Sequence, residues 1–432
     1  MEPSIYRARR ARLASQMQSG VAVLPTAPEH ARNRDSHYPY RYDSYFYYLT
    51  GFREPEAVLV VIAGDTTKSI LFCREKDPER EVWDGFRYGP DAARATFGFD
   101  EAYPVGQLDE MMPQLLSNQN ALFCHLGSDD VWDARIMRWV NEVRGRARAG
   151  VTAPQTIRDL HAPLDEMRLL KDATEIELMR RAARISADAH RRAMRAAKPG
   201  VGEFAIEAEL MHEFRRNGAQ APAYTPIVAS GAHACVLHYV ENADVLRDGD
   251  LILIDAGCEL DGYASDITRT FPVNGRFSGP QRDVYDLVLS AQQEAIAEIR
   301  PGNQWIAPHD AAVKVLAQGF VDLGLLKGSV DQVLETESYK QFYMHRTGHW
   351  LGLDVHDAGD YKRDGEWRQL EPGMVLTVEP GCYIRPGSDV PEHYAGIGVR
   401  IEDDALVTAS GCEIITAAAP KTISDIESLM RP

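Results

Sequence analysis

The chain has 432 residues, of which 44% are hydrophobic and 26% charged, and its formal net charge is -17. Two domains are expected at this length, because single hydrophobic cores stop growing at roughly 250–300 residues. The excess of negative charge argues against a nucleic-acid partner, since binding to phosphates requires positive charge that displaces counterions.

The six cysteines are scattered without a CxxC pair, which favours reduced thiols over a disulfide framework. The first residues lack the apolar segment of a signal peptide, and no apolar run approaches the roughly 18 residues of a membrane span. We therefore expect a soluble, cytoplasmic protein. The basic cluster between Arg7 and Arg12 alternates with alanine and predicts a solvent-exposed helix face.

Up to about residue 165, the pattern predicts alternating strands and helices. Ala57 to Ala63 and Ser69 to Cys73 are short apolar runs bounded by turn residues, as buried strands are. A strong helix is predicted to begin near Asp172, with Glu175 at capping-box spacing, and to end before Pro199. We place a domain junction within residues 163–172, which gives an N-terminal α/β domain of residues 1–167 and a second domain of residues 168–432.

The second part contains a loose internal repeat. The segments Gly249 to Gly257 and Gly373 to Gly381 each hold a glycine, a mostly apolar stretch, an acidic residue and a second glycine. A predicted helix and a histidine-bearing segment precede each of them, the helices covering residues 203–216 and 309–323. Two related halves would bring both acidic strand ends into one site. The alternative is coincidence between two ordinary turn-strand-turn segments.

The first acidic pair is Asp255, at the end of an apolar run, and Asp266, in the strand-like run 263–271. A tight loop centred on residues 260–261 would place the two aspartates directly opposite each other, whereas one centred on 261–262 would make them diagonal neighbours. Either register puts both on the same face of the hairpin. Two carboxylates forced together repel each other unless a cation or a proton intervenes. The alternative is a hairpin with two exposed aspartates.

The second acidic pair is Glu379, which also ends an apolar run, and Glu402. Arg400 lies two residues before Glu402, so the two side chains share one face of a strand while Val399 and Ile401 take the other. A surface ion pair between Arg400 and Glu402 is the alternative, but four acids at or within apolar strands favour a metal site.

Histidines cluster at residues 345, 349 and 356. His345 and His349 have the spacing of a helical metal pair, but the HExxH glutamate is missing and Gly348 weakens a helix. One histidine ligand, with the others donating hydrogen bonds, fits this spacing better. His238 precedes Asp255 much as the cluster precedes Glu379. Two aspartates, two glutamates and one histidine favour Mn²⁺ or Co²⁺ over Zn²⁺ or Fe²⁺, with carboxylates bridging two ions.

These motifs resemble those of the metallopeptidases of pita-bread fold, and most closely those of the aminopeptidase P family. The similarity covers nearly the whole chain and includes the segments LILIDAG, HWLGLDVHD and GVRIEDD, as well as the N-terminal block DSHYPYR followed by LTGF. It implies an α+β protein, in which a smaller α/β domain precedes a C-terminal pita-bread catalytic domain with a pseudo-twofold curved antiparallel sheet and flanking helices. The segment Arg346-Thr347-Gly348 departs from the pattern expected in close relatives.

The resemblance also implies roles for individual residues. The five metal ligands fall, in chain order, on Asp255, Asp266, His349, Glu379 and Glu402. His238, His345 and His356 are implied to be histidines of the site that bind no metal, and Arg400 to pair with Asp35. Trp83 is implied to help complete a neighbouring subunit's site in a tetramer, although its local sequence alone favours a core aromatic.

We therefore expect a metal-dependent aminopeptidase that hydrolyses the N-terminal Xaa-Pro bond through a hydroxide bridging two ions, most simply Mn²⁺. Glu379 would shuttle the proton, and a dimer or tetramer is expected. One alternative is a prolidase that accepts only Xaa-Pro dipeptides. Another is a peptide-binding pita-bread protein without catalysis, against which all five ligand residues argue. Creatinase-like C–N hydrolysis does not require so many metal ligands.

Overall fold

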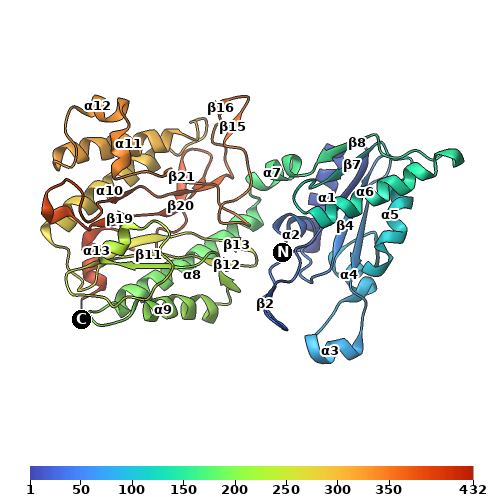
Figure 1. Cartoon of the computed structure of the whole chain (residues 1–432), viewed down its shortest axis with the longest axis horizontal. Helices are drawn as coiled ribbons and strands as arrows, with labels where there is room; N and C mark the ends of the chain where they lie inside the picture. Colours follow the sequence, from blue (N-terminus) through green and yellow to red (C-terminus); the bar gives the residue numbers. More distant parts are fainter. Residues whose placement is uncertain (432) are drawn as a thin grey trace. The chain divides into compact units, whose positions relative to one another are not determined.

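The computed structural model describes residues 1–431, and the chain divides into two compact units, Met1–Met167 and Arg168–Pro432 (Figure 1). The first unit is built on a six-stranded sheet with the strand order β6-β5-β4-β1-β7-β8. These strands are β1 (Gly20–Pro25), β4 (Val58–Ala63), β5 (Lys68–Cys73), β6 (Glu101–Pro104), β7 (Ala121–Cys124) and β8 (Thr156–Asp159). The sheet is mixed, because β4 pairs antiparallel with β1 and β5 while the outer strands pair in parallel.

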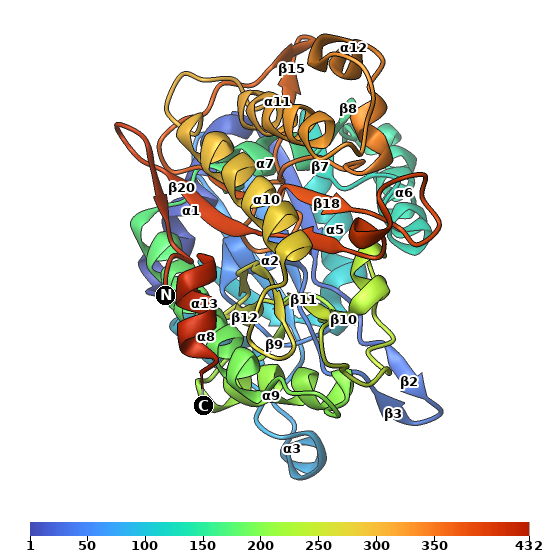
Figure 2. The same ribbon diagram turned by 90° about the vertical axis from the view of Figure 1, so that its left-hand side faces the viewer.

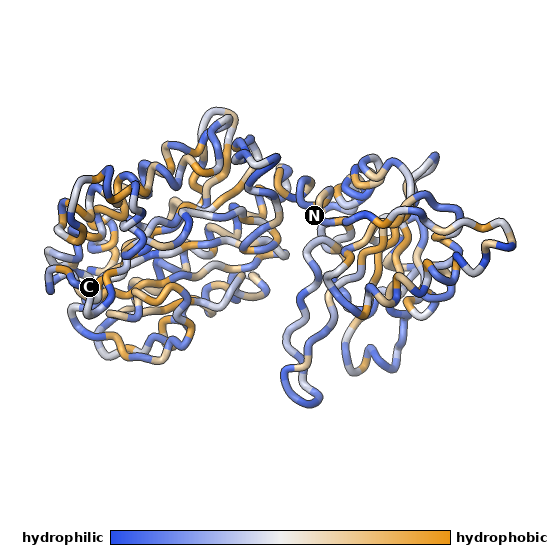
Figure 3. The backbone as a smooth tube through the Cα atoms, turned by 45° about the horizontal axis from the view of Figure 1, so that its top comes forward, coloured by the Kyte–Doolittle hydropathy of each residue, from blue (hydrophilic) through white to orange (hydrophobic). Residues whose placement is uncertain are grey.

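Helices and one short hairpin complete this unit. The helices are α1 (Pro3–Met17), α2 (Ser44–Thr50), α3 (Pro78–Asp84), α4 (Gly89–Phe97), α5 (Leu108–Leu116) and α6 (Asp130–Gly145), and the hairpin is β2 (Ala31–Asn33) with β3 (Ser36–His37). Helix α7 (His161–Leu169) begins in this unit and ends in the second. Apolar residues of the central strands pack against α5 and α6, and Figure 3 shows the hydrophobic colour along these strands. The apolar runs predicted as strands are therefore confirmed.

Two details of this unit differ from the predictions. Arg9 and Arg10 are buried rather than solvent-exposed, because their guanidinium groups stack on Tyr48 and Phe99 and bond to backbone carbonyls. Trp83 lies on the short helix α3 with 84% of its surface exposed, so the prediction of a core aromatic from its local sequence is wrong.

The second unit places small antiparallel sheets between two pairs of helices (Figures 1 and 2). Its helices are α8 (Ala173–Ala196), α9 (Glu203–Arg216), α10 (Gly279–Ala297), α11 (Ala307–Asp322), α12 (Val330–Glu335) and α13 (Ile423–Leu429). Its strands are β9 (Ala221–Pro222), β10 (Ile227–Ser230), β11 (Leu251–Asp255), β12 (Cys258–Leu260), β13 (Tyr263–Ala264), β14 (Thr268–Pro272), β15 (Lys362–Arg363), β16 (Glu366–Trp367), β17 (Val375–Val378), β18 (Gly381–Tyr383), β19 (Gly398–Arg400), β20 (Asp403–Val407) and β21 (Cys412–Ile414).

Helix α8 begins with the predicted capping box. Asp172 accepts hydrogen bonds from the backbone N–H groups of Thr174 and Glu175, and the Glu175 carboxylate accepts one from the backbone of Asp172. This arrangement satisfies donors that would otherwise be unpaired at the helix start. The same helix buries Met179, Ala183 and His190 in the second unit.

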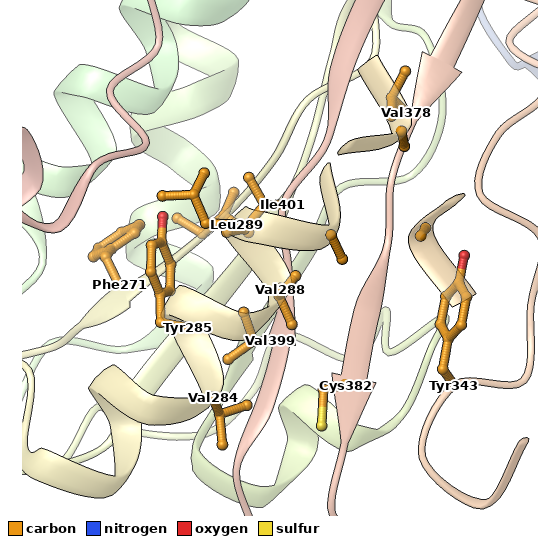
Figure 4. Packing of buried hydrophobic residues seen from close by; sticks show 14 of the residues in the cluster. Phe271, Val284, Tyr285, Val288, Leu289, Tyr343, Val378, Cys382, Val399 and Ile401 are labelled. Atoms are coloured by element: carbon orange, nitrogen blue, oxygen red, sulfur yellow. The ribbon is translucent and has the colours of Figure 1, made fainter. Parts of the chain in front are cut away.

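The core of the second unit holds the acidic strands in place. Val399 and Ile401 are fully buried and pack with residues of α10 and β17, including Val288 and Val378 (Figure 4). Because alternate residues of a strand face opposite sides, this burial directs Arg400 away from the apolar core. The predicted division of this strand into an apolar and a polar face is confirmed.

The six cysteines are free thiols, five of them buried. No helix within residues 1–431 combines the length and the apolar character needed to cross a bilayer.

The buried histidine of α8 generates a prediction about stability. Nε2 of His190 lies 2.9 Å from the Ala256 carbonyl oxygen, so it donates, and the buried Nδ1 has no partner. Burial lowers the pKa of His190 to about 4, whereas an unfolded histidine titrates near 6.5. Below pH 6.5 the unfolded chain therefore binds more protons, and the free energy of unfolding falls as the pH decreases towards 4.

We expect His190→Gln to reduce this fall in the free energy of unfolding by on the order of 2–3 kcal/mol between pH 6.5 and 4. The measurement is urea unfolding at several pH values, with His212→Gln on the exposed face of α9 as the control. If the free energy of unfolding falls equally with pH in the wild type and His190→Gln, the lowered pKa of His190 is contradicted.

Candidate metal centre

Two strand pairs bring the predicted acids together. In the first pair, Asp255 is opposite Thr268 in the ladder between β11 and β14, and Leu260 is opposite Tyr263 at the turn. The loop is therefore centred on residues 261–262, and Asp255 and Asp266 are diagonal neighbours, which is the second of the two predicted registers. Residues 265–267 are not in a strand, so the predicted continuous run 263–271 is interrupted at Asp266.

A glycine permits this close approach. A Cβ atom on Gly257 would lie 1.6 Å from the Ser265 carbonyl oxygen, so no other residue fits without moving the backbone. The second half of the unit has a similar constraint, since a Cβ atom on Gly348 would lie 2.0 Å from the Thr377 carbonyl oxygen. Each glycine allows the backbone beside one site residue to lie against a neighbouring segment.

In the second strand pair, the two glutamates face each other. The partners Val378 with Asp403 and Gly381 with Arg400 continue one register on either side of the break between the ladders. This register places Glu379 opposite Glu402. In each half, one acid lies at or directly after the end of β11 or β17, and a second lies shortly before the partner strand β14 or β20. The internal repeat predicted that the two acidic strand ends, Asp255 and Glu379, would meet in one site, and both line the same cavity.

All four acids, together with five further residues proposed for the site, line one cavity of the second unit. The lining includes His238, Asp255, Asp266, His345, His349, His356, Glu379, Arg400 and Glu402. Of these, Asp266 and Glu402 are buried, whereas His238 and His356 are exposed. The polar residues predicted from this half of the chain are therefore gathered in one place, with the acids at its buried end.

His349 is positioned among the carboxylates. Its Nδ1 donates to the Trp350 carbonyl oxygen at 3.0 Å, which directs Nε2 to within 3.4 Å of Asp266 and 3.6 Å of Glu379. Burial lowers the pKa of His349, but the contacts with Asp266 and Glu379 outweigh it and raise the pKa to about 9. Metal-binding histidines usually donate their other ring N–H to a backbone carbonyl or carboxylate, as His349 does.

Burial and crowding shift the pKa values of the carboxylates. Burial raises the pKa of Glu379 to about 7 and raises that of Glu402 well above its usual range, with the neighbouring acids adding to both effects. Asp266, His349 and Glu402 each offer a ligand atom, and these atoms lie within 4.8 Å of one another. A buried oxygen of Asp404, whose other oxygen accepts from the Asp266 backbone, has no partner. This donor set fits a divalent cation, which would neutralise the repulsion.

A chain of hydrogen bonds links Asp255 to the histidine cluster. Arg400 donates to Asp255 at 2.7 Å and to the Tyr383 hydroxyl at 3.1 Å. His345 donates from Nδ1 to the Arg346 carbonyl, so its Nε2 accepts from Tyr383 at 2.8 Å. Burial lowers the pKa of His345 to about 3, which is consistent with a neutral ring.

Sequence reasoning missed several residues of the site. The Tyr224 hydroxyl contacts both Asp255 and Asp266, and Tyr383 joins Arg400 to His345. Thr268 donates to Glu402 at 2.7 Å. Strand alternation could have indicated Thr268, which lies two residues after Asp266. The tyrosines gave no such signal, because an aromatic residue near an apolar strand is ordinarily a core residue.

Two predicted residues lie outside this cavity. Asp35 is exposed in the turn between β2 and β3, and Trp83 is exposed on α3. Both belong to the first unit, so the pairing of Asp35 with Arg400 stays a prediction.

Comparison with known proteins identifies two family models. Residues 177–409 match metallopeptidase family M24, and residues 6–123 match the aminopeptidase P N-terminal domain. The chain is 48% identical to an Xaa-Pro aminopeptidase of Haemophilus influenzae, over 98% of this chain and 96% of the relative. It is 47% identical to that of Escherichia coli, over 98% and 97%.

Solved structures of aminopeptidases also match the whole chain. An aminopeptidase of Pseudomonas aeruginosa superposes with a TM-score of 0.98 at 52% identity, covering 100% of this chain and 98% of that one. A variant of the Escherichia coli aminopeptidase P in complex with substrate has a TM-score of 0.97 at 45% identity, with coverage of 100% and 98%.

The repulsion among the acids generates a prediction about metal removal. Stripping divalent ions with a chelator should lower the melting temperature, and restoring Mn²⁺ should raise it, because ions that bind the folded state stabilise it. Glu402→Gln should reduce the difference in melting temperature between the stripped protein and the protein restored with Mn²⁺. Glu392→Gln on the surface should leave this difference unchanged. Differential scanning calorimetry measures both, and an identical response in Glu402→Gln and the wild type would contradict the proposed site.

Proposed function

The chain belongs to metallopeptidase family M24 and is a metal-dependent Xaa-Pro aminopeptidase, and we propose that two divalent ions are held by Asp255, Asp266, His349, Glu379 and Glu402. The fold of the family, an α/β N-terminal domain before a pita-bread catalytic domain, is the fold described above. The convergence of four carboxylates and one histidine in one cavity carries the proposal. The oxygen-rich donor set favours Mn²⁺, with Co²⁺ or Zn²⁺ as alternatives.

When bound, the ions polarise the scissile carbonyl and lower the pKa of water, so that a nucleophile is available near neutral pH. The protein's own groups then position the peptide. We place the α-amino group at the buried end of the cavity beside Asp255, which confines cleavage to the first peptide bond. Exposed His238 and His356 line the cavity walls, and one of them donates to the carbonyl oxygen as negative charge develops there.

The proline nitrogen needs a proton to leave. An Xaa-Pro bond is a tertiary amide without an N–H, so its nitrogen becomes a secondary amine only by gaining a proton when the C–N bond breaks. Glu379 is suited to this transfer, because it lines the cavity among the residues proposed to hold the ions and a carboxylate can take up and release a proton. It takes the proton from water as the water oxygen adds to the carbonyl carbon, and it delivers the proton to the nitrogen.

Arg400 and His345 help to hold other residues of the site in position. Arg400 is fixed by Asp255, Tyr383 and Thr268, and holds the Asp255 carboxylate in one orientation. His345 lies 3.8 Å from Glu379 and is held by Tyr383.

An oligomer, as a dimer or tetramer, is part of this proposal. Val82, Trp83 and Phe86 are exposed apolar residues on and beside α3. Such a group is typical of an interaction surface, and it supports a contact of Trp83 with a neighbouring subunit's site. We also propose that Asp35 contributes to substrate binding or to an interface.

Glu379 provides a direct test of the mechanism. We expect Glu379→Ala to lower kcat by roughly 10²–10⁴-fold, the usual contribution of a positioned acid–base group. Metal content must be measured alongside, because Glu379 is also a proposed ligand. Full activity with a normal metal content would refute the role in proton transfer.

Substrate specificity is tested by restoring Mn²⁺, Co²⁺ or Zn²⁺ separately to stripped protein. We expect cleavage of Xaa-Pro-Yaa tripeptides, slower cleavage of Xaa-Pro dipeptides and little cleavage of Met-Ala-Yaa peptides, as measured by release of the first amino acid. A preference for dipeptides would indicate a prolidase, and no cleavage of any Xaa-Pro bond with any metal would overturn the proposal.

A further inference from the structure

The active-site cavity is lined by two arginines in different electrostatic situations. Arg400 is buried and ion-paired with Asp255. Arg346 is exposed at the cavity wall, and within the described part of the chain no carboxylate lies within ion-pair distance of it. An unpaired cation beside a substrate cavity is notable in a chain whose net charge is -17.

The backbone and side chain of Arg346 are both held in place. Its carbonyl accepts from His345 at 2.7 Å, which ties this residue to the hydrogen-bond chain through Tyr383. Its guanidinium carbon lies 5.7 Å from the centroid of the Trp367 ring, which also carries the Lys362 ammonium group at 4.3 Å. The aromatic contact restrains the guanidinium group without neutralising its charge.

Neither Asp310 nor the buried acids of the cavity pair with this charge. Burial raises the pKa of Asp310 on α11, although Lys314 and Arg346 act in the opposite direction. The acids at the buried end of the cavity are Asp266 and Glu402, which are 5% and 1% exposed and face the proposed ions. Arg346 therefore presents a cation towards the solvent side of the cavity.

The direction of the peptide determines what Arg346 meets. The proposed mechanism places the N-terminal residue at the buried acids, so the chain that follows proline leaves past the exposed part of the wall. A carboxylate on this part of a peptide pairs with a guanidinium group. The overall negative charge of the protein repels acidic peptides at a distance, so a local cation has most effect on binding within the cavity.

We infer that Arg346 is a specificity-determining residue that favours Xaa-Pro peptides with a carboxylate shortly after the proline. The carboxylate is either the C-terminus of a tripeptide or an acidic side chain at the third position. This inference rests on the proposed function, which supplies the direction of the bound peptide.

Two peptide pairs distinguish a C-terminal carboxylate from a side-chain carboxylate. The first pair is Ala-Pro-Ala with a free C-terminus and the same peptide with a C-terminal amide. The second pair is Ala-Pro-Glu-Ala amide and Ala-Pro-Gln-Ala amide, in which only the side chain differs. The protein is the Mn²⁺-loaded full chain, as wild type, Arg346→Gln, Arg346→Lys and Lys362→Gln. Lys362 is the matched control, because it contacts the same tryptophan but does not line the cavity.

We expect the wild type to prefer the carboxylate member of at least one pair by roughly three- to tenfold in kcat/KM, mainly through KM. The preference should weaken at high salt because the contact is exposed. Arg346→Gln should lose it, Arg346→Lys should keep part of it, and Lys362→Gln should keep all of it.

Two results would overturn the inference. A wild type that cleaves both members of each pair equally well would contradict it while leaving the proposed function intact, and so would a preference that survives in Arg346→Gln. Failure of the wild type to cleave any of the four peptides would instead refute the proposed function and this inference together.

Discussion

Mutual repulsion among four carboxylates that line one cavity is the constraint around which the second unit is organised. Asp255 and Asp266 are brought together by one strand pair, and Glu379 and Glu402 by another. Burial and the neighbouring acids raise the pKa of Glu379 and Glu402, whereas burial is outweighed at Asp266, whose pKa is lowered by His349, Tyr224 and Arg400. One arginine and one histidine offset part of this charge, and divalent ions would offset the rest.

The surrounding fold is built to hold that arrangement against the repulsion. Arg269 is completely buried and bonds to the Glu402 carbonyl oxygen and to the side chain of Asp403. Lys421, near the C-terminal end of the chain, donates to the same Asp403 carboxylate at 2.7 Å. Buried polar networks of this kind are stable only when their members are satisfied, so this one fixes a single geometry for the segment that carries Glu402. Buried ion pairs and hydrogen bonds thus help to position this acid.

Local rules predicted much of this structure from the sequence. The capping box at Asp172 and the apolar face of Val399 and Ile401 follow from short-range patterns, and both are confirmed. For the first acidic pair, alternation required only that the two residues share a face. The choice between opposed and diagonal positions depended on which turn formed, and a positive φ at Asp261 and Gly262 accompanies the diagonal one.

Other features depend on contacts between residues that lie far apart in the sequence. Tyr224 approaches its two aspartates across 31 and 42 positions, and no local pattern distinguishes it from a core tyrosine. Arg9 and Arg10 lie in a charged run that ordinarily predicts a solvated helix face, but Tyr48 and Phe99 provide the surfaces that bury them. The spacing of the motifs alone did not predict specificity for proline. That specificity follows from the Xaa-Pro aminopeptidases that match nearly the whole chain.

Anomalous X-ray diffraction from crystals of the full chain loaded with Mn²⁺ would test the organising role of the carboxylates most directly. We predict two anomalous peaks in the cavity of the second unit, roughly 3.5–4 Å apart, with Asp255 and Asp266 contacting one or both and Glu379 and Glu402 completing the set with His349. Crystals that bind Mn²⁺ only elsewhere, or that show the four carboxylates in contact with no ion, would contradict this role.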